Sequence, residues 1–552
     1  MKQMNKFKLS AVAVLLSLGC ANATFAETSF DVRSFQLSGN IQALTDSDQI
    51  ALAEVLAPFQ GKDKTLDTLK QAQKAAQDKL VQLGKEQYEL VLPEQRVENG
   101  NVLFQVVHRS AQKSRVIYQG SEGFDAKNIE NSLPSLKAAK FYEDGRQWFE
   151  YREFAMAQEN PLKVTRMHYE LNPQNKASEL TVAGYSPYGK NRSFVAVDNY
   201  GSREFNRGRV TVGHVNANLT GKDDVLSVMA LTNFKAPSKS YALGLAYTRP
   251  FYDKHQTLGV QVGYSHLDSE DSDGLPSLIN RKMARGKTTV VGVNWSYFLP
   301  SFDLGVQDQF KINAGYSYRH YDQRSSLSTT MTGIYIPTNS QVFSVAGVNL
   351  GISGEVKITP EATINMELTD YYYSHKIPGS RHMDRLGENY NRDYNIVFYR
   401  LGYSQDFAEG WNFNTQLSGQ YTRQDLSSID SFSVSGVYGV RGFKYANVSG
   451  ERGLVWRNEI SMPKYTQYKI SPYAFYDLGQ YRANKVNAEN FGNKHHTVSS
   501  AGMGVRAEIV KNLNADVFMA HRLANSGADN LNNNRAFVSD KTTFWGRLSY
   551  SF

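Results

Sequence analysis

Hydrophobic and polar residues alternate through the second half of the chain with a repeat of two residues. In "TLGVQVGY", the residues Leu258, Val260 and Val262 fall on one face, with polar or small residues opposite. The same alternation recurs in "YALGLAY", in "WNFNTQLSGQY" and in "TTFWGRLSYSF", which ends at Phe552. A repeat of two places successive side chains on opposite faces of a β-strand. Residues 185–552 therefore predict a long series of strands separated by polar, Gly/Asn/Asp-rich loops.

These strands have one apolar face and one polar face, which leaves too little apolar surface for the core of a β-sandwich. Closing the sheet into a transmembrane barrel satisfies every backbone group without an edge and allows a polar lumen. One strand with its loop takes about 23 residues, which predicts about 16 antiparallel strands. Aromatic residues cluster at strand ends, as in interfacial girdles. Long loops are expected at His266–Lys287 and Ser374–Asp393.

The region from Phe30 to about Val107 has a mixed pattern in the order β-α-α-β-β. "FDVRSFQLSG" alternates like a strand, and "DSDQIALAEVLAPF" predicts a helix with Ile50, Ala53 and Leu56 on one face. "TLDTLKQAQKAAQDKLVQLG" predicts a longer helix whose apolar face consists of Leu66, Leu69, Ala76, Leu80 and Leu83. Its polar run "KQAQKAAQDK" is expected to be a solvated face, with a partner-binding face as the alternative.

A second segment, residues 108–184, repeats that order less clearly. "KSRVIYQGSEGF" predicts a strand, residues 128–133 and 147–158 predict helices, and "LKVTRMHYELNP" with "SELTVAGY" predicts a closing hairpin. Asn99-Gly100 predicts the corresponding hairpin turn in the first segment. Two tandem modules of about 75 residues each would form compact domains.

The N-terminus has the features of a secretory signal, predicted over residues 1–26. Three lysines and no acids precede a short apolar stretch, "LSAVAVLLSLG", and cleavage is expected after Ala26 or Ala23. "SLGC" weakly resembles a lipoprotein box, so lipidation of Cys20 is the less favoured alternative. Cys20 is the only cysteine, and cleavage at Ala26 would leave a mature chain without disulfides.

Composition excludes several classes of protein. A mean hydropathy of −0.47, with 33 Tyr and 29 Phe, argues against a bundle of membrane helices and suits a strand-rich protein. Removal of the three signal lysines lowers the formal charge from +8 to +5, and no basic block stands out. This mild surplus gives no indication of a nucleic-acid partner.

One glycine-rich loop, "GVYGVRGFKYANVSGERG" at residues 436–453, carries Arg441 at its tip. A cation inside a protein-lined lumen requires a partner. Asp477 in "YAFYDLGQ" is the candidate, because alternation turns Tyr473, Phe475 and Asp477 inward and their neighbours toward lipid. We expect an Arg441–Asp477 pair to fix the loop tip to the barrel wall.

No motif predicts an enzyme, and we expect no catalytic residues, no cofactor and no metal. "GMGVRA" (residues 502–507) imitates a dinucleotide fingerprint but lies on a predicted strand with no helix after it. His495-His496 could bind a metal, although "NKHH" is expected to be an exposed loop. The chain contains neither H-E-x-x-H nor G-x-S-x-G. Scattered Ser, His and Asp side chains leave a membrane-embedded hydrolase open, but no spacing favours one.

Two short motifs give the chain a specific resemblance. "VRGF" (Val440, Arg441, Gly442 and Phe443) and "FYDLG" (Phe475, Asp477 and Gly479) occur in order. Together they resemble the loop-tip and strand motifs of the TpsB family, the outer-membrane transporters of two-partner secretion, which include haemolysin secretion/activation proteins and contact-dependent inhibition transporters. The resemblance covers essentially the whole mature length, with "VLPEQRVENG" similar to the end of the family's first periplasmic module.

The resemblance implies an organisation in domains. Residues 27–107 and 108–184 would be two polypeptide-transport-associated (POTRA) domains in the periplasm, and 185–552 an outer-membrane barrel. Residues 436–453 would be its sixth loop, folded inward, and Phe552 the signal read by the barrel assembly machinery. The family often has a plug helix before the first POTRA domain. Here the first strand follows the cleavage site at about Phe30, which leaves no room for it.

The implied function is export of an unfolded exoprotein through the barrel without ATP. The POTRA domains would bind the exoprotein's N-terminal secretion domain, and an adhesin, a cytolysin and a contact-dependent toxin all remain open as partners. Barrel assembly machinery and outer-membrane lipid are further expected partners. The alternatives are a barrel-assembly insertase of the Omp85 type and a general diffusion porin. Two modules and the nearby "FYDLG" favour secretion.

Overall fold

The structure is a computed structural model that separates into two compact units. One comprises residues up to 159 with 163–187, and the other comprises 160–162 with 188–552. The predicted signal segment lies outside the described residues. The structure describes residues 29–552 except 86, 94, 96, 98, 109–114, 138–141, 144–145, 148–150, 172–177, 202–206, 272–278, 303–305, 330–334, 375–392, 427–429, 444–448, 485–494 and 527–540.

The first half of the N-terminal unit is an α+β module. Its three-stranded sheet has the order β2-β5-β4, and β1 pairs with β3 beside it. Asn99 and Gly100 both adopt positive φ, 55° and 79°, as a tight Asn-Gly turn before β5 requires. The elements are β1 (Phe30–Val32), β2 (Ser34–Gly39), η2 (Ile41–Ala43), α2 (Asp46–Leu56), η3 (Ala57–Phe59), β3 (Gly61–Lys64), α3 (Leu66–Gln82), β4 (Tyr88–Val91) and β5 (Asn101–His108).

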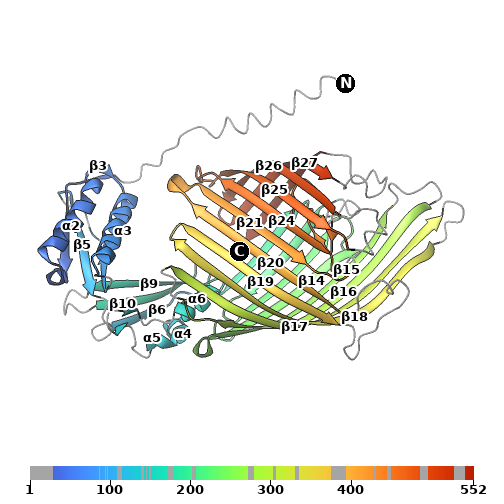
Figure 1. The fold of residues 1–552 in the computed structure, drawn as a ribbon, viewed down its shortest axis with the longest axis horizontal. Helices are drawn as coiled ribbons and strands as arrows, with labels where there is room; N and C mark the ends of the chain where they lie inside the picture. The colour runs from blue at the N-terminus through green and yellow to red at the C-terminus, as the bar shows by residue number, and fades with distance from the viewer. Residues whose placement is uncertain are drawn as a thin grey trace, which may run out of the picture. The chain divides into compact units, whose positions relative to one another are not determined.

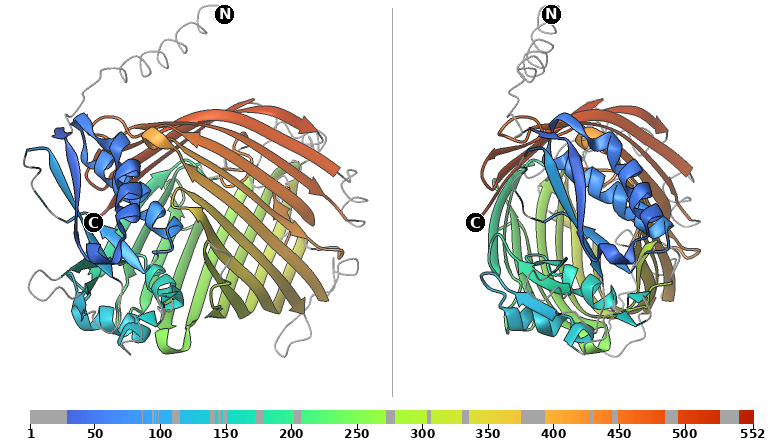
Figure 2. Two further views of the ribbon diagram at one scale, coloured as in Figure 1. Left: turned by 60° about the vertical axis from the view of Figure 1, so that its left-hand side comes forward. Right: turned by 90° about the vertical axis from the view of Figure 1, so that its left-hand side faces the viewer.

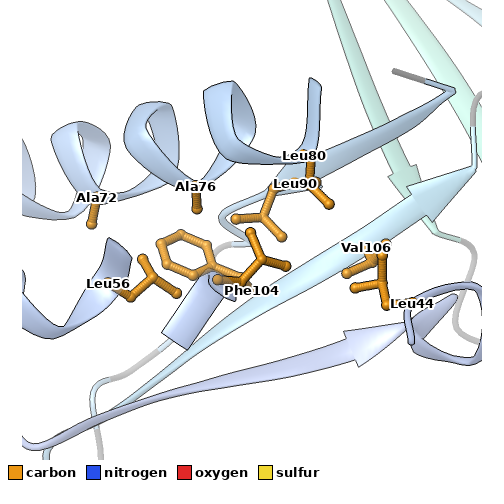
Figure 3. Packing of buried hydrophobic residues seen from close by; sticks show 9 residues of the cluster. Leu44, Leu56, Ala72, Ala76, Leu80, Leu90, Phe104 and Val106 are labelled. Atoms are coloured by element: carbon orange, nitrogen blue, oxygen red, sulfur yellow. The ribbon is translucent and has the colours of Figure 1, made fainter. Parts of the chain in front are cut away.

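The core of this module lies between the two helices and the sheet (Figure 3). Phe104 of β5 is fully buried and stacks on Phe35 at a centroid distance of 5.5 Å. The helices contribute one buried stripe each, which removes apolar side chains from water and supplies most of the driving force for packing. The cluster consists of Leu44, Leu52, Leu56, Ala72, Ala76, Leu80, Leu90, Phe104 and Val106.

The predicted apolar face of α2 is wrong at Ile50 and Ala53 and confirmed at Leu56, which is 2% exposed. Ile50 is 61% exposed and Ala53 is exposed, whereas Leu52 is fully buried. The helix begins with a capping box between Thr45 and Asp48, and this start turns the Asp48–Leu52–Leu56 stripe toward the core. On α3, Leu69, Ala76 and Leu80 are buried as predicted, but Leu66 is 55% exposed.

The polar face of α3 does more than contact solvent. Gln77 accepts a hydrogen bond from the Leu90 backbone N–H at 2.7 Å and donates to the Tyr88 carbonyl at 3.1 Å. Gln73 donates to the Leu90 carbonyl at 2.8 Å. These amides take the place of a neighbouring strand along the outer edge of β4. That edge is therefore closed by side chains, which limits edge-to-edge association there.

The second half of the unit has a sheet of order β6-β10-β9 with helices beside it. None of the helices in the described part of the chain is long and apolar enough to cross a membrane. The predicted helix at 147–158 is shorter, because Arg146 and Gln147 lie in a strand. The elements are β6 (Arg115–Gln119), α4 (Ala126–Ser132), α5 (Pro134–Lys137), β7 (Tyr142–Glu143), β8 (Arg146–Gln147), α6 (Tyr151–Gln158), β9 (Val164–Leu171) and β10 (Ser178–Tyr185).

The second unit is a closed antiparallel barrel of 16 strands, which confirms the predicted fold class and strand number. Figures 1 and 2 show the strands side by side with a common tilt. The strands are β11 (Asn191–Asp198), β12 (Arg209–Asn216), β13 (Val225–Asn233), β14 (Ser240–Phe251), β15 (Gln256–Asp271), β16 (Ile279–Phe298), β17 (Gln307–Thr329), β18 (Tyr335–Thr359), β19 (Ala362–Ser374), β20 (Asp393–Asp406), β21 (Asn412–Tyr421), β24 (Arg452–Ser461), β25 (Ser471–Arg482), β26 (His495–Val510), β27 (Leu513–Ser526) and β28 (Thr542–Ser551).

The two faces of the barrel wall differ as the alternation predicts. Large apolar side chains on one face are exposed, including Leu243 (51%), Leu350 (63%) and Phe544 (64%). Small polar side chains such as Thr257 and Thr369 alternate with apolar ones along the strands, lie on the opposite face and are buried. An apolar outer band around a polar interior is the pattern of an outer-membrane barrel. Two 3₁₀ turns, η5 (Tyr252–Lys254) and η6 (Ala408–Gly410), join strands at one end.

One predicted loop is wrong in extent. Strand β15 continues to Asp271 and β16 begins at Ile279, so most of His266–Lys287 belongs to paired strands rather than to a loop. Polar residues here do not interrupt the ladder, because both partners supply backbone groups whatever their side chains are. The loop expected at Ser374–Asp393 begins where β19 ends and finishes where β20 begins. Residues 375–392 between these strands lie outside the described part.

The seam that closes the barrel is short, and deletion of Phe552 is expected to weaken it. β11 pairs β28 over five residue pairs, against eight between β11 and β12. Phe552 adds two backbone hydrogen bonds, donating to the Ser193 carbonyl at 2.9 Å and accepting from the Ser193 N–H at 2.8 Å. We expect less folded barrel at 37 °C, measured by heat-modifiable gel mobility. A chain with Phe552→Tyr, which keeps both backbone bonds, serves as control, and equal folding of the deletion would contradict the prediction.

Candidate functional site

The site lies on the connection between β21 and β24, residues 422–451, here called the β21–β24 segment. Within it β22 (Phe432–Ser433) pairs with β23 (Ser449–Gly450). Val434, Val440 and Phe443 pack into a buried cluster with Val455, Tyr481 and Val498 of the wall strands β24, β25 and β26. Those wall residues lie on the face opposite the exposed apolar band, so the segment folds into the lumen.

Arg441 lies at the tip of this segment and is only 2% exposed. Its Nε donates to Asp477 Oδ2 at 2.9 Å and its Nη2 donates to Asp477 Oδ1 at 2.8 Å. The Arg441 backbone N–H adds a third bond to Asp477 Oδ2, at 3.0 Å. A planar guanidinium that meets a carboxylate through two parallel bonds is the strongest and most directional ion pair available to side chains.

A second carboxylate completes the environment of the guanidinium. Arg441 Nη1 donates to Glu459 Oε2 at 2.7 Å, and Glu459 Oε1 also accepts from Arg506 at 2.6 Å. The guanidinium carbon lies 3.5 Å above the ring of Phe475, a cation–π contact. Asp477 is fully buried, so the pair is shielded from water on the wall side.

The backbone around Arg441 is also held by side chains of the wall. Trp545 Nε1 donates to the Arg441 carbonyl at 2.8 Å, and Thr543 Oγ1 and Arg522 Nε donate to the Gly442 carbonyl at 3.1 and 2.9 Å. The Gly442 N–H donates to Ser500 Oγ at 3.0 Å. These partners come from β26, β27 and β28. The tip Val440–Phe443 therefore contacts five consecutive strands, from β24 to β28.

The two motif glycines make room for this contact. A Cβ on Gly479 would lie 2.8 Å from Val440 Cγ2 and 3.1 Å from Val434 Cβ. A Cβ on Gly442 would lie 2.6 Å from Ser500 Cβ. Both distances are shorter than van der Waals contact, so any larger residue must push the segment away from the wall. Glycine is required at both positions because the β21–β24 segment lies very close to the wall strands, and not because of an unusual φ.

Gly479→Ala is therefore expected to loosen the tip. Overpacking of this kind costs about 1–3 kcal/mol, which corresponds to roughly a tenfold higher population of detached tip. Ser435, which bridges to Val440, is 5% exposed, so a Ser435→Cys reporter in the mature chain should react with maleimide roughly tenfold faster in the Gly479→Ala background. Gly244→Ala is the control, because a Cβ there meets nothing within 4 Å. Equal labelling rates in both backgrounds would contradict the prediction.

The remaining sequence candidates lie apart from this site. Phe552 is at the closing seam and 65% exposed. The expected exposed loop at His495-His496 is wrong, because both residues begin β26 and His496 is buried against Tyr481 at 4.9 Å. Residues 502–506 lie within β26 and pair with both β25 and β27, and Ala507 pairs with β27. Among described residues, no group of three His, Cys, Asp or Glu side chains is placed to hold a metal ion.

Sequence reasoning missed most partners of the tip. Glu459 could have been found, because Arg457 and Glu459 alternate with the exposed Trp456 and Ile460 on β24 and so face inward. No local signal marks Ser500, Arg522, Thr543 and Trp545, which meet the tip only through the register of the closed sheet.

A charged cavity of about 520 Å³ lies in the second unit near these strands. Both acidic and basic side chains line the cavity, so no single sign of charge dominates it. Such a mixed lining suits a hydrated lumen better than a site for one small ion. The charged lining residues are Asp406, Lys464, Lys469, Arg506, Glu508, Asp516 and Arg547.

Residues 186–507 match the family described as haemolysin secretion/activation protein ShlB/FhaC/HecB. The chain belongs to this family. The match covers most of the barrel and includes both the tip Val440–Phe443 and the wall motif Phe475–Gly479. As a member of this family with a closed β-barrel, the protein resides in the Gram-negative outer membrane.

Individual relatives agree at low identity. The chain is 23% identical over 367 residues to the heme/hemopexin transporter protein HuxB of Haemophilus influenzae, covering 65% of this chain and 60% of HuxB. It is 34% identical over 98 residues to the outer membrane transporter CdiB-2 of Burkholderia pseudomallei, or 17% of this chain and 16% of that one. The match thus spans about 60% of the length of HuxB.

A solved structure shares the fold. CdiB from Escherichia coli superimposes with a TM-score of 0.62 at 15% identity, and the match covers 96% of this chain and 92% of CdiB. At this level of identity the likeness establishes the fold and not the cargo.

Proposed function

We propose that this chain is the outer-membrane transporter of a two-partner secretion system. It takes a large, unfolded exoprotein from the periplasm and passes it through the barrel lumen to the cell surface. The observation that carries the proposal is the inward-folded β21–β24 segment, whose family-matched tip is bound to the inner wall by Arg441 and Asp477. HuxB, a relative of the chain, is named a heme/hemopexin transporter protein, which supports a transport role.

The N-terminal unit is the proposed receptor, formed by two POTRA domains in the periplasm. In its first sheet the outer edge of β4 is occupied by Gln73 and Gln77, whereas in the described part of the chain β2 pairs only with β5. An unfolded exoprotein can add an extended segment to such an edge through main-chain hydrogen bonds. We therefore propose that the exoprotein first binds along the edge of β2. Side chains beside that edge would then select its sequence.

Transport is proposed to need no ATP. The sequence contains no nucleotide-binding loop, and the proposed route lies outside the inner membrane. Folding of the exoprotein at the cell surface would remove it from the pore and oppose its return, because an unfolded chain that folds gains 5–15 kcal/mol, on the order of typical domain stabilities. The energy source is then the cargo's own stability.

The test begins with the gene neighbourhood, where we expect a gene for a large exoprotein with an N-terminal secretion domain. Deletion of the transporter gene should leave that exoprotein in the periplasm, and a plasmid copy should restore it to the medium. The fraction in medium, periplasm and membrane is measured by immunoblot. Unaltered secretion in the deletion strain would overturn the proposal.

The same strains separate the alternatives. Loss of several unrelated barrels from the outer membrane would instead support a barrel-assembly insertase. Unchanged secretion together with reduced uptake of small solutes would support a diffusion porin. Normal assembly and normal solute uptake, with only the exoprotein retained, is the result expected of a dedicated transporter.

A further inference from the structure

Two arginines lie opposite each other on the outer face of the barrel wall. Arg452 of β24 is the cross-strand partner of Arg482 of β25. Even spacing along a strand places side chains on one face, so Arg452 shares its face with Trp456, and Arg482 shares its face with Tyr476. Trp456 and Tyr476 are 43% and 40% exposed and belong to the lipid-facing band. Both arginines therefore point to the outside of the barrel.

The row continues on the strands to either side, β21 and β26 (Figure 1). Arg482 also pairs with His495, the exposed first residue of β26. The Arg452 guanidinium lies 5.3 Å from the ring centroid of Tyr421, the last residue of β21, and exposed Arg423 donates from Nε to Tyr421 OH at 3.3 Å. These five side chains, Tyr421, Arg423, Arg452, Arg482 and His495, are here called the arginine patch.

The protein does not neutralise the charges of the arginine patch. Within the described part of the chain, no carboxylate lies within ion-pair distance of Arg423, Arg452 or Arg482. Arg452 Nε donates instead to the neutral side chain of Asn484, at 3.0 Å. Like charges directly opposite on neighbouring strands are destabilising. The Arg452–Arg482 pair therefore costs stability unless an anion from outside the chain binds to it.

Other outward arginines at the same end of the barrel have acidic neighbours. Arg285 of β16 lies opposite Asp268 of β15, and its Nε donates to Asp268 Oδ1 at 3.2 Å. Arg324 of β17 binds both oxygens of Asp322, at 3.0 and 3.2 Å. Arg285 has the parity of the exposed, lipid-facing Val291. The arginine patch differs from these pairs because it presents guanidinium groups and no acid.

The arginine patch lies at the cell-surface end of the wall. At this end β21 stops at Tyr421 and β24 starts at Arg452, whereas at the other end β18 stops at Thr359 and β19 starts at Ala362. Outer-membrane barrels have short periplasmic turns and longer connections outside the cell. Arg452 is four residues, or about 13 Å, beyond the lipid-facing Trp456 along β24. This places the arginine patch at the level of the headgroups of the outer leaflet.

We propose that the arginine patch binds the phosphate groups of a glycolipid in the outer leaflet. A lipid is the fitting occupant because the arginine patch continues the lipid-facing surface of the same strands at headgroup level. A guanidinium binds two phosphate oxygens through parallel hydrogen bonds. One phosphate between Arg452 and Arg482 replaces their mutual repulsion by two attractions. Tyr421 adds an amphipathic ring of the kind found at membrane interfaces.

The bound lipid would also brace the part of the wall that holds the loop tip. The inner faces of β24 and β25 carry Glu459 and Asp477, which bind Arg441. A phosphate held by Arg452 and Arg482 links the same two strands from the outside. The lipid site goes beyond the proposed transport function and does not depend on the identity of the exported partner.

The test is the Kd of the purified full chain in detergent for fluorescently labelled lipid A, the phosphorylated lipid of the outer leaflet. One cation near a membrane surface changes binding roughly fivefold. We expect Arg452→Gln and Arg482→Gln to raise the Kd roughly fivefold each, and the double variant to raise it more than roughly tenfold. Arg452→Lys should weaken binding less than Arg452→Gln, because it keeps the charge but not the two-bond geometry. Arg285→Gln is the matched control, since Asp268 already neutralises that arginine.

Each result decides the proposal. Equal affinity of wild type and the double variant overturns it, as does an equal loss in Arg285→Gln. Lipid A without phosphate groups should bind wild type and the double variant alike, and a difference there would overturn the role of phosphate. If the double variant does not fold, judged by heat-modifiable mobility, the exposed Arg482→Gln decides alone.

Secretion by the same variants separates this site from the transport function. Unchanged lipid A binding together with lost secretion in the double variant would assign the arginines to the exoprotein and overturn the lipid site. Weakened lipid A binding in a protein that exports no exoprotein would support the lipid site and overturn the transporter function.

Discussion

Replacement of Arg441 with alanine is expected to lower exoprotein secretion roughly a hundredfold while the barrel still assembles. The substitution leaves Asp477 buried at 0% exposure without the guanidinium that binds both of its oxygens. Arg457 Nε remains 3.9 Å from Asp477 Oδ1, too far for a hydrogen bond, so the buried carboxylate loses its close partner at a cost of about 3 kcal/mol. The tip can avoid that cost only by leaving the wall so that water reaches Asp477. A detached tip would lie free in the lumen, in the path of the cargo.

Lysine at this position is the informative second variant. Arg441→Lys keeps the charge but has a single ammonium group, which cannot bond both Asp477 oxygens and Glu459 with the same geometry. We expect secretion between that of wild type and Arg441→Ala. Exoprotein in the medium is measured by immunoblot at matched outer-membrane levels of each variant, with heat-modifiable mobility as the measure of folding.

Arg400→Ala is the matched control. Arg400 also bonds a carboxylate on the neighbouring strand, Glu367, at 3.2 Å, but its side chain is 46% exposed. Exposed pairs contribute about 0–1 kcal/mol, so secretion should stay near the wild-type level. Equal secretion by Arg441→Ala and wild type would show that the Arg441–Asp477 pair has no part in transport.

The barrel could be predicted from sequence because its rule is local. Each strand needs only alternation, and Leu258, Val260 and Val262 or Leu243 and Leu245 are exposed together as that rule requires. Strand number followed from length alone. The extent of β15 and β16 did not, because polar residues beyond His266 remain paired through their backbones.

The helices of the first unit show a different limit. Ile50 and Ala53 match the helical repeat as well as Leu52 does, and only the capped start of α2 and the position of the sheet decide which stripe is buried. Gln73 and Gln77 read as solvent-facing residues, since their bonds to β4 depend on a strand that follows later in the chain. Tertiary packing, not local periodicity, fixes such choices.

The candidate site likewise contains residues that local pattern can identify and residues that only tertiary packing brings together. Two arguments were enough to pair Arg441 with Asp477. Alternation turns the Asp477 side chain toward the lumen, and a cation inside the lumen needs an anionic partner. Trp545, by contrast, is separated from Arg441 by 104 residues and meets it only because β28 returns to close the ring. Sequence identified the ion pair and not the wall that holds it.

Deletion of residues 29–187 is expected to lower secretion on the order of 10²-fold without loss of the barrel. The deletion removes the first compact unit together with residues 160–162, which belong to the second unit but to none of its strands. The closing seam uses residues from Ser193 onward, so the ring of 16 strands keeps all its strand partners. In the receptor role proposed for this unit, tethering at the pore raises the effective concentration of captured cargo, so its removal should reduce export on the order of 10²-fold.

The deletion is compared with a point variant that leaves the unit folded. Gln36→Lys alters an exposed residue of β2, the edge assigned to capture, while the core face with Phe35 and Leu37 stays intact. A new positive charge on an edge strand disfavours addition of another strand. We expect Gln36→Lys to lower secretion less than the deletion does. If the shortened chain secretes as well as the full one, capture resides in the barrel, and the edge of β2 has no part in transport.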